Sequence, residues 1–438
     1  MNGGARQYGA GPRRSGGSAR GSVPPAGRRG TSTVQPSRYY GICAAASSAS
    51  VESAYVRLGP FNGPQDALDQ RGGADASLLV AGWQVSHLME AWRYFGSSLH
   101  ALLRNSPNNA LHLGYYAQLR SAMSLFAGSG ISVKMDNCFY LDAVGNRHVF
   151  RGEPTHKIVW NMWKEWTSHP YARALIGDHI KFRPSISLSA ITYAPGAGQS
   201  LLDAWGYDLF TGSEDHTERN TASYEPKSDM PTPVMTYDSV EFVRSVWDML
   251  GSVGTGIKFD AALAKYFVSL WADDLATNGE PSEAGKTAEE VIEDVIGRLS
   301  GGSDLESEAL RGIFLGDVDT TLFALASSND VGVTNVLARA LFLLRIATIG
   351  VSRAIELAES QNTECKAWIR NWLLQVGVLG DSDVEPGDVW EDYITASDQI
   401  QPARNGVLPS ALWAAGIAEH SATLSRAEGF CAWGLPVA

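Results

Sequence analysis

Cysteine is scarce in this chain, and the features that would assign it to a well-known class are missing. The four cysteines stand far apart and form no CxxC pair, so the sequence indicates neither a zinc site nor a disulfide framework and favours a reducing, intracellular (cytoplasmic) compartment. No run of 18 apolar residues is present, so we expect no membrane-spanning helix and no membrane partner. The motifs HExxH and GxSxG and a glycine-rich dinucleotide loop are also absent. The sequence therefore predicts no metal ion and no cofactor.

Acidic residues and lysine are absent from the first 51 residues, which contain seven arginines. This stretch carries a charge of +7, and because the whole chain carries −12, the remaining residues carry −19. Residues 1–37 have few large apolar side chains, so they cannot bury enough surface to offset the entropy lost on ordering. We expect a disordered arm, which is either a solvated, dispensable extension or a segment that contacts nucleic acid. In the second case RNA is the favoured partner and the contacts come from Arg6, Arg13, Arg14, Arg20, Arg28 and Arg29.

The rest of the chain has mostly helical patterns, and apolar residues make up 44% of the whole sequence, which is enough for a packed interior. Apolar residues recur at helical spacing over 77–105 and 111–126. Strand patterns follow at 131–135 and at 138–150, the second with a tight hairpin turn at 145–146. A polar, proline-containing stretch at 211–235 is typical of a linker. Only helical patterns follow it.

These patterns predict a mainly α, multi-helix, two-domain protein with one small β-hairpin element and a disordered N-terminal arm. A length of 438 residues agrees with this division, since domains usually have about 100–200 residues. The predicted parts are the arm at 1–37, a helical domain with the hairpin at 38–210, a linker at 211–235 and an all-helical domain at 236–438.

The stretch RGEPTH, residues 151–156, directly precedes the amphipathic pattern KIVWNMWKEW. Its first and last residues, Arg151 and His156, have the spacing that HEPN-type ribonucleases use. In that chemistry the arginine holds the scissile phosphate and the histidine transfers a proton near neutral pH. Arg151 and His156 are therefore the candidate catalytic residues.

Two further Arg–His pairs have comparable spacing, Arg93–His100 and Arg173–His179. Each pair lies within one predicted helix, so we interpret these residues as surface or satisfied core residues. The composition of the chain accounts for about this number of pairs by chance, so the spacing alone does not identify a site.

The segments ALHLGYYAQLRSAMSLFAGSGISV, PTHKIVWNMWKEW and ARALFLLRIATIG resemble bacterial helical proteins of the YaaC-like and HEPN-like kind, some of which belong to antiphage defence. The resemblance covers Leu111–Trp166 and Ala338–Gly350, a minority of the chain. It implies a role in microbial defence or nucleic-acid metabolism, with metal-independent RNA cleavage as the activity. The positions that it makes functional are Tyr115, Tyr116, Arg120, Thr155 and His156.

Two motifs resemble phosphate-handling loops but have simpler interpretations. The sequence GKT at 285–287 opens a helix as a P-loop does, but the earlier glycine and the preceding strand are missing, and Thr287 with Glu290 forms a capping box. Asp317 and Asp319 resemble the nucleophile loop of haloacid-dehalogenase-type phosphatases, but only helical patterns follow. Asp319 is more simply the N-cap of the next helix.

Two arginines, Arg339 and Arg345, lie within an apolar helix predicted over Asn335–Ile355, which we interpret as a buried core helix. A buried guanidinium must be paired or must hold an anion, because an isolated charge in the interior is too costly. We expect an internal salt bridge.

Three functions agree with these observations. The first is a ribonuclease of defence or nucleic-acid metabolism that uses Arg151 and His156. The second is a self-assembling shell or capsid protein, a homo-oligomer located in the virion, whose arginine-rich arm contacts packaged nucleic acid. The third is a helical interaction module without activity of its own.

Overall fold

The computed structural model describes residues 38–58, 75–104, 106–134, 138–150, 153–167, 169–192, 237–253, 256–278, 286–328, 330, 332–358, 364–380, 386–400 and 417–436. The predicted arm at 1–37 with its six arginines lies outside the described residues, as do Arg151 and the predicted linker at 211–235. These predictions stay predictions.

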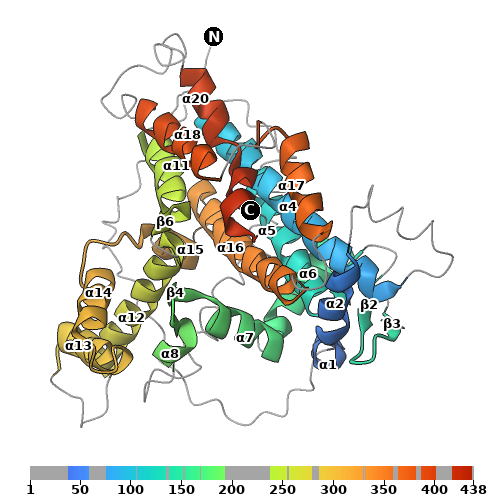
Figure 1. The fold of residues 1–438 in the computed structure, drawn as a ribbon, viewed down its shortest axis with the longest axis horizontal. Coiled ribbons are helices and arrows are strands. Elements are labelled where there is room, and N and C mark those ends of the chain that lie inside the picture. Colours follow the sequence, from blue (N-terminus) through green and yellow to red (C-terminus); the bar gives the residue numbers. More distant parts are fainter. Residues whose placement is uncertain are drawn as a thin grey trace, which may run out of the picture. The chain divides into compact units, whose positions relative to one another are not determined.

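Seventeen α-helices and two 3-10 helices make up most of the described chain, which confirms the mainly α class (Figure 1). The helices before the predicted linker are α1 (Arg38–Ala45), α2 (Ala49–Ala54), η1 (Tyr55–Arg57), α4 (Ala76–Leu103), α5 (Pro107–Gly128), α6 (Thr155–Trp166), α7 (Pro170–His179) and α8 (Leu188–Thr192). The helices after it are α11 (Tyr237–Leu250), α12 (Lys258–Asn278), α13 (Ala288–Leu299), α14 (Asp304–Phe314), α15 (Thr321–Ser327), α16 (Val333–Ala358), α17 (Glu364–Gln375), α18 (Pro386–Gln399), α20 (Ile417–Leu424), η4 (Ala427–Phe430) and α21 (Cys431–Gly434).

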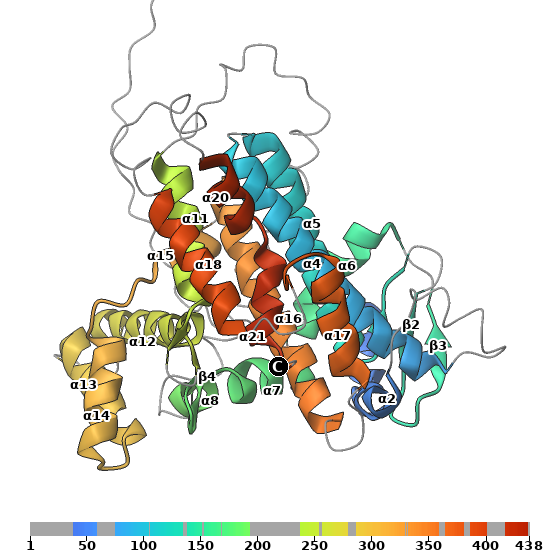
Figure 2. The same ribbon diagram turned by 45° about the horizontal axis from the view of Figure 1, so that its top comes forward.

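Three long helices, α4, α5 and α16, pack against one another in the hydrophobic core. In Figure 2, α4 and α5 run side by side, and α16 lies next to them. Every residue of α16 from 335 to 351 is buried, as expected for a helix that is apolar on all sides. This confirms the predicted core helix. Among the described residues, no helix combines the length and the apolar content needed to cross a membrane.

The two predicted helical domains are not separate in the structure. Helices α4 and α5 belong to the predicted first domain and α16 to the second, yet their side chains share one core, and Arg38–Ala438 forms one compact unit. The physical reason lies in α16, because a helix buried on every side needs partners from both parts of the chain. The other unit, Met1–Ser37, lies outside the described residues.

The predicted hairpin is confirmed, and the strand predicted over 131–135 pairs with it at Ile131–Ser132. Strands β1 (Ile131–Ser132), β2 (Phe139–Leu141) and β3 (Arg147–Val149) form an antiparallel sheet in that order. Gly145 has a φ of +85° in the turn, where a side chain would be strained. Two further hairpins, β4 (Lys181–Arg183) with β5 (Ile186–Ser187) and β6 (Ser252–Val253) with β7 (Gly256–Ile257), were not predicted, because strands of two or three residues are too short to show alternation.

The two phosphate-loop resemblances are explained by helix capping. Thr287 and Glu290 form the predicted capping box at the start of α13, and each side chain bonds the backbone N–H of the other residue. The carboxylate of Asp319 accepts hydrogen bonds from the backbone N–H of Thr321, at 2.8 Å, and from its hydroxyl. The N-cap position of α15 is Thr320, one residue later than predicted, but Asp319 still satisfies the first N–H of the helix.

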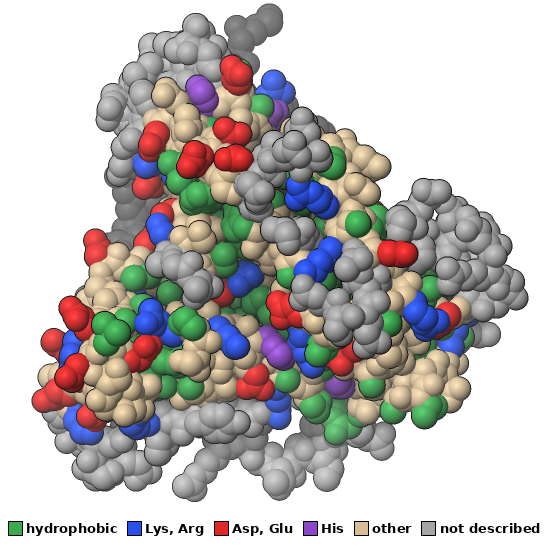
Figure 3. Space-filling view, in the orientation of Figure 1, with side chains coloured by type: hydrophobic (Ala, Val, Ile, Leu, Met, Phe, Trp, Pro, Cys, Tyr) green, Lys and Arg blue, Asp and Glu red, His purple; other side chains and the backbone are tan. Residues whose placement is uncertain are grey.

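Charged side chains of both signs are interspersed over α13 and α14, at the lower left of Figure 3. Arg311 donates from Nε to Glu293 Oε1 at 2.8 Å, and Lys286 Nζ lies 2.7 Å from Asp294 Oδ2. Ion pairs this exposed to water contribute little to stability.

The expected internal salt bridge joins Arg345 of α16 to Asp260 of α12. Nε donates to Oδ1 at 2.9 Å and Nη2 to Oδ2 at 2.6 Å, with both side chains almost fully buried. Such a bidentate pair fixes the relative position of the two helices, because both charges lose their partners if the helices slide.

The second buried arginine of α16, Arg339, is satisfied by main-chain oxygens. Nη1 donates to the carbonyl of Ser328 at 3.0 Å and Nη2 to that of Asp330 at 3.2 Å. Both buried guanidinium groups therefore have protein partners, and neither needs a bound anion.

Replacing Asp260 by Ala should lower the free energy of unfolding by about 3–5 kcal/mol, because Arg345 would stay buried without its partner. Denaturant-induced unfolding measures the change. The matched control is Asp294→Ala, which breaks the exposed pair with Lys286 and should change the midpoint little. Equal, small effects of the two variants would contradict a structural role for the buried pair.

Candidate functional site

The candidate catalytic pair is only partly described. His156 lies in the first turn of α6, which Thr155 begins, and both side chains are half-buried. Arg151 lies outside the described residues, so its distance from His156 is not defined. The pairing of these two residues stays a prediction.

Tyr115 and Tyr116, which the resemblance makes functional, form packing contacts. Tyr115 is fully buried on α5, and its hydroxyl accepts a hydrogen bond at 3.1 Å from the indole of Trp160 on α6. Tyr116 stacks on Tyr94 of α4, with ring centroids 5.5 Å apart, and lies against the ring of His112. These contacts join α4, α5 and α6.

The third such residue, Arg120, belongs to a cluster on α4 and α5. Its Nη1 lies 3.2 Å from His87 Nδ1, and its Nε lies 3.1 Å from Glu90 Oε2. Burial lowers the pKa of His87, although the hydrogen bond with Glu90 opposes the shift, and the charge of Arg120 lowers it further. At neutral pH the imidazole is therefore uncharged and accepts from the guanidinium, which also forms an ion pair with Glu90.

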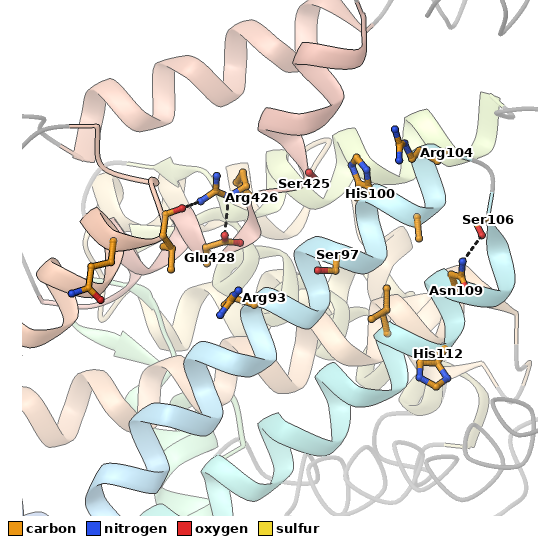
Figure 4. Close-up of a pocket in the computed structure, with 14 residues that line it drawn as sticks. Arg93, Ser97, His100, Arg104, Ser106, Asn109, His112, Ser425, Arg426 and Glu428 are labelled. Carbon is orange, nitrogen blue, oxygen red and sulfur yellow. Dashed lines mark hydrogen bonds and ion pairs between the residues drawn. The ribbon is translucent and has the colours of Figure 1, made fainter. Parts of the chain in front are cut away.

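A pocket of about 970 Å³ lies at the C-terminal half of α4 (Figure 4). Its walls are α4, the start of α5, the end of α17 and the segment between α20 and η4. The volume is at the upper end of the range for small-molecule sites. The charged and imidazole side chains that line it are Arg93, His100, Arg104, His112, Arg426 and Glu428.

One wall of the pocket is a single face of α4. Arg93, Ser97, His100 and Arg104 follow one another at intervals of four, three and four residues, so they lie along one face of α4 (Figure 4). The other face of α4 packs into the core through Trp92, Phe95, Leu99 and Leu103. The face with Arg93 therefore points away from the core.

The opposite wall is the segment Ser425–Glu428, which is held by side chains from other helices. The indole of Trp247 donates to the carbonyl of Leu424 at 2.8 Å, and the hydroxyl of Tyr393 donates to that of Arg426 at 2.6 Å. Arg426 itself donates to the carbonyl of Val376 at the end of α17. The pocket therefore exists only when α4, α11, α17 and α18 are assembled.

The close approach of this segment to α4 depends on Gly96. A Cβ atom at this position would lie 2.2 Å from the carbonyl oxygen of Ser425 and 3.0 Å from the backbone nitrogen of Ala427. No side chain fits at these distances unless the segment moves.

The pocket is electropositive. Three guanidinium groups line it against one carboxylate, Glu428, which is buried and accepts from Arg426 Nε at 2.8 Å. Burial and the nearby charge of Arg104 lower the pKa of His100, so its imidazole is neutral at pH 7 and offers one donor and one acceptor.

The sequence predicts Arg93 and His100 to be surface or core residues, and the structure places both on the pocket wall. The intervals that align Arg93, Ser97, His100 and Arg104 are visible in the sequence. The sequence does not show that the segment Ser425–Glu428 faces these residues, because this segment lies about 320 residues later in the chain. Arg173 and His179, on α7, do not line this pocket.

A second pocket, of about 490 Å³, lies between α11 and α18. Its lining includes four carboxylates, Glu241, Asp248, Asp319 and Asp398, and Asp248 is paired with Lys258. Within the described ranges, no group of three or more His, Cys, Asp or Glu side chains is placed to hold a metal ion.

The cysteines are unsuited to nucleophilic chemistry. All four are buried and none forms a disulfide, and burial raises the pKa of Cys43 and of Cys365 to about 12. A thiol with so high a pKa carries almost no thiolate at neutral pH.

Comparisons with known proteins identify no relative: no family model, no curated protein and no solved structure matches the chain.

Replacing Gly96 by Ala should destabilise the protein by about 1–3 kcal/mol, because the added methyl group overlaps the backbone of Ser425. Thermal unfolding measures the effect. The control is Gly297→Ala on the exposed face of α13, where a Cβ meets nothing within 4 Å and the change should stabilise by up to about 1 kcal/mol. Stabilisation by both variants would mean that Ser425–Glu428 does not lie on α4.

Proposed function

We propose that this protein is a nucleic-acid-binding shell protein, whose folded helical body assembles and whose N-terminal arm contacts packaged nucleic acid. The observation that carries the proposal is the separation of charge along the chain, with seven arginines and no acid in residues 1–51 and a charge of −19 on the remainder. RNA is the favoured cargo.

The charge separation supports this function through electrostatics. An acidic body repels phosphate, so the contact with nucleic acid falls to the arm, where each arginine that neutralises a phosphate releases a counterion. Six or seven charges give weak binding for one copy. A shell brings many arms to the same polymer, and the combined affinity rises steeply without any new kind of contact.

The contacts of two residues that the resemblance makes functional, Tyr115 and Arg120, also favour a non-enzymatic body. Tyr115 bonds Trp160, and Arg120 contacts His87 and Glu90, so these side chains hold helices together. Residues that serve packing in this way are not available to a substrate.

Purified full-length protein should form particles of megadalton mass that absorb strongly at 260 nm. Replacing the six arm residues Arg6, Arg13, Arg14, Arg20, Arg28 and Arg29 by Gln should remove the nucleic acid, because the phosphate contacts are lost. Light scattering with the 260/280 nm absorbance ratio of the same peak measures both properties. The matched control replaces the same six residues by Lys, which keeps the charge and should keep the nucleic acid. A wild-type species of one to a few subunits without nucleic acid would contradict the proposal.

The second candidate function is RNA cleavage, which one specific observation favours. Arg93 and His100, a pair with HEPN-like spacing, both line the pocket at α4. There a neutral His100 would accept the proton of the 2′-hydroxyl and Arg93 would stabilise the charge that develops on the phosphate. A role in microbial defence would accompany this activity.

If the protein cleaves RNA at this pocket, His100→Ala should lower the rate by about 100-fold or more, since general-base catalysis contributes about that factor. His179→Ala, a half-buried histidine on α7, is the control and should retain the rate. Loss of cleavage in His156→Ala but not in His100→Ala would instead assign the activity to Arg151 and His156. No cleavage by the wild type would exclude both pairs.

A further inference from the structure

We infer that the pocket at α4 is a binding site for a phosphate group, carried either by a free nucleotide or by an RNA strand. The inference concerns binding only and does not depend on assembly or on cleavage. Three properties support it: the positive charge of the pocket, the guanidinium of Arg93 at its edge, and the polar and apolar side chains that line the rest of it.

The charges of the pocket favour an anion. Arg93, Arg104 and Arg426 face a cavity whose one lining carboxylate, Glu428, already accepts from Arg426. The Glu428 charge is therefore matched within the wall, and Arg93 and Arg104 add positive charge from α4, with no second carboxylate among the lining residues. Guanidinium groups bind phosphate oxygens in a bidentate manner, which a chloride ion or a single carbonyl cannot match.

Arg93 is available to a ligand. Within the described residues its guanidinium forms no hydrogen bond and no ion pair. Of the effects that lower the pKa of Glu90, one turn earlier on α4, the hydrogen bond with His87 is the largest and the charge of Arg93 is the smallest. The side chain is exposed and lies at the edge of the pocket (Figure 4). A phosphate would gain this contact without breaking an existing one.

The arginine side chains deeper in the molecule do not compete for this role. The guanidinium of Arg345 forms a bidentate pair with Asp260, and that of Arg339 donates to the carbonyls of Ser328 and Asp330. The second pocket is lined by four carboxylates and two cationic side chains, Arg244 and Lys258, so its net negative charge disfavours phosphate. The pocket at α4 thus stands out among the described cavities as one suited to an anion.

The uncharged lining matches the rest of a nucleotide. Asn109 is oriented by a hydrogen bond from its Nδ2 to Ser106 Oγ at 2.9 Å, which leaves its carbonyl oxygen as an acceptor. Ala101, Leu113 and Val376 add apolar surface against which a ribose or a base packs. A volume of about 970 Å³ accommodates a whole nucleotide and exceeds what inorganic phosphate needs.

His100 couples binding to pH. The groups that face it are Arg93 and Arg104 on its own helix, His112 from α5, and the Arg426–Glu428 pair across the pocket. In the free protein burial and Arg104 favour the neutral imidazole. A bound phosphate opposes both effects and favours the protonated form, so binding should take up a proton and become tighter as the pH falls from 8 to 6.

The test is calorimetric titration of the full-length protein with inorganic pyrophosphate, a mononucleoside diphosphate and a dinucleotide with one internal phosphodiester. The pocket variant Arg93→Ala/His100→Ala should lower affinity about tenfold or more for the ligands that bind, because charge-assisted hydrogen bonds are lost. The matched control is Arg173→Ala/His179→Ala on α7, which keeps the same arm and loses the same residue types outside the pocket. Melting temperatures verify that both variants are folded.

Selective loss of pyrophosphate and nucleoside diphosphate binding would support the site with a free nucleotide as its ligand. Selective loss of dinucleotide binding, which tightens toward pH 6 in the wild type but not in His100→Ala, would support the site with an RNA strand as its ligand. Equal affinities of wild type and pocket variant for all three probes, or equal losses in the pocket and control variants, would overturn the inference.

Discussion

The buried ion pair between Arg345 and Asp260 is the interaction on which the arrangement of this protein depends. It anchors α12 to α16, the helix that α4 and α5 enclose, and the guanidinium also lies 5.8 Å from the ring of Phe430 in η4. Phe430 in turn packs on Trp92 of α4, with centroids 5.0 Å apart. The charge of Arg345 is tolerated only when these partners surround it, so the pair selects one packing of the core from the many that an apolar helix allows.

The core also positions the segment Ser425–Glu428, and this segment forms one wall of the pocket at α4. Indole and phenol groups of Trp247 and Tyr393 donate to carbonyls of the segment, and Gly96 lets its backbone approach α4. Buried polar groups of large aromatic residues need such partners, because an unsatisfied donor in the interior is costly. The same contacts that close the core thus form one wall of a basic pocket.

The charges of the protein are organised on two scales. Along the chain, a basic stretch precedes an acidic remainder, and this charge separation is the basis of the proposed contact with nucleic acid. Within the folded part, three arginines gather at the pocket although the surrounding body is acidic overall. A local basic cluster against an acidic background restricts anion binding to that place, which suits a site for one phosphate group better than a surface for a long polymer.

Sequence alone determined the elements whose signals are local. The long helices, the Gly145 turn, the Thr287 capping box and the buried nature of α16 follow from periodicity, backbone freedom and hydrogen bonds within a few residues. Only the tertiary structure decided which helices share a core, that Asp260 is the partner of Arg345, and that Arg93 and His100 face the segment around Arg426. These pairings join residues 85 to more than 300 positions apart. Nothing in the local pattern specifies them, because the free energy that selects one pairing comes from the packing of the whole core.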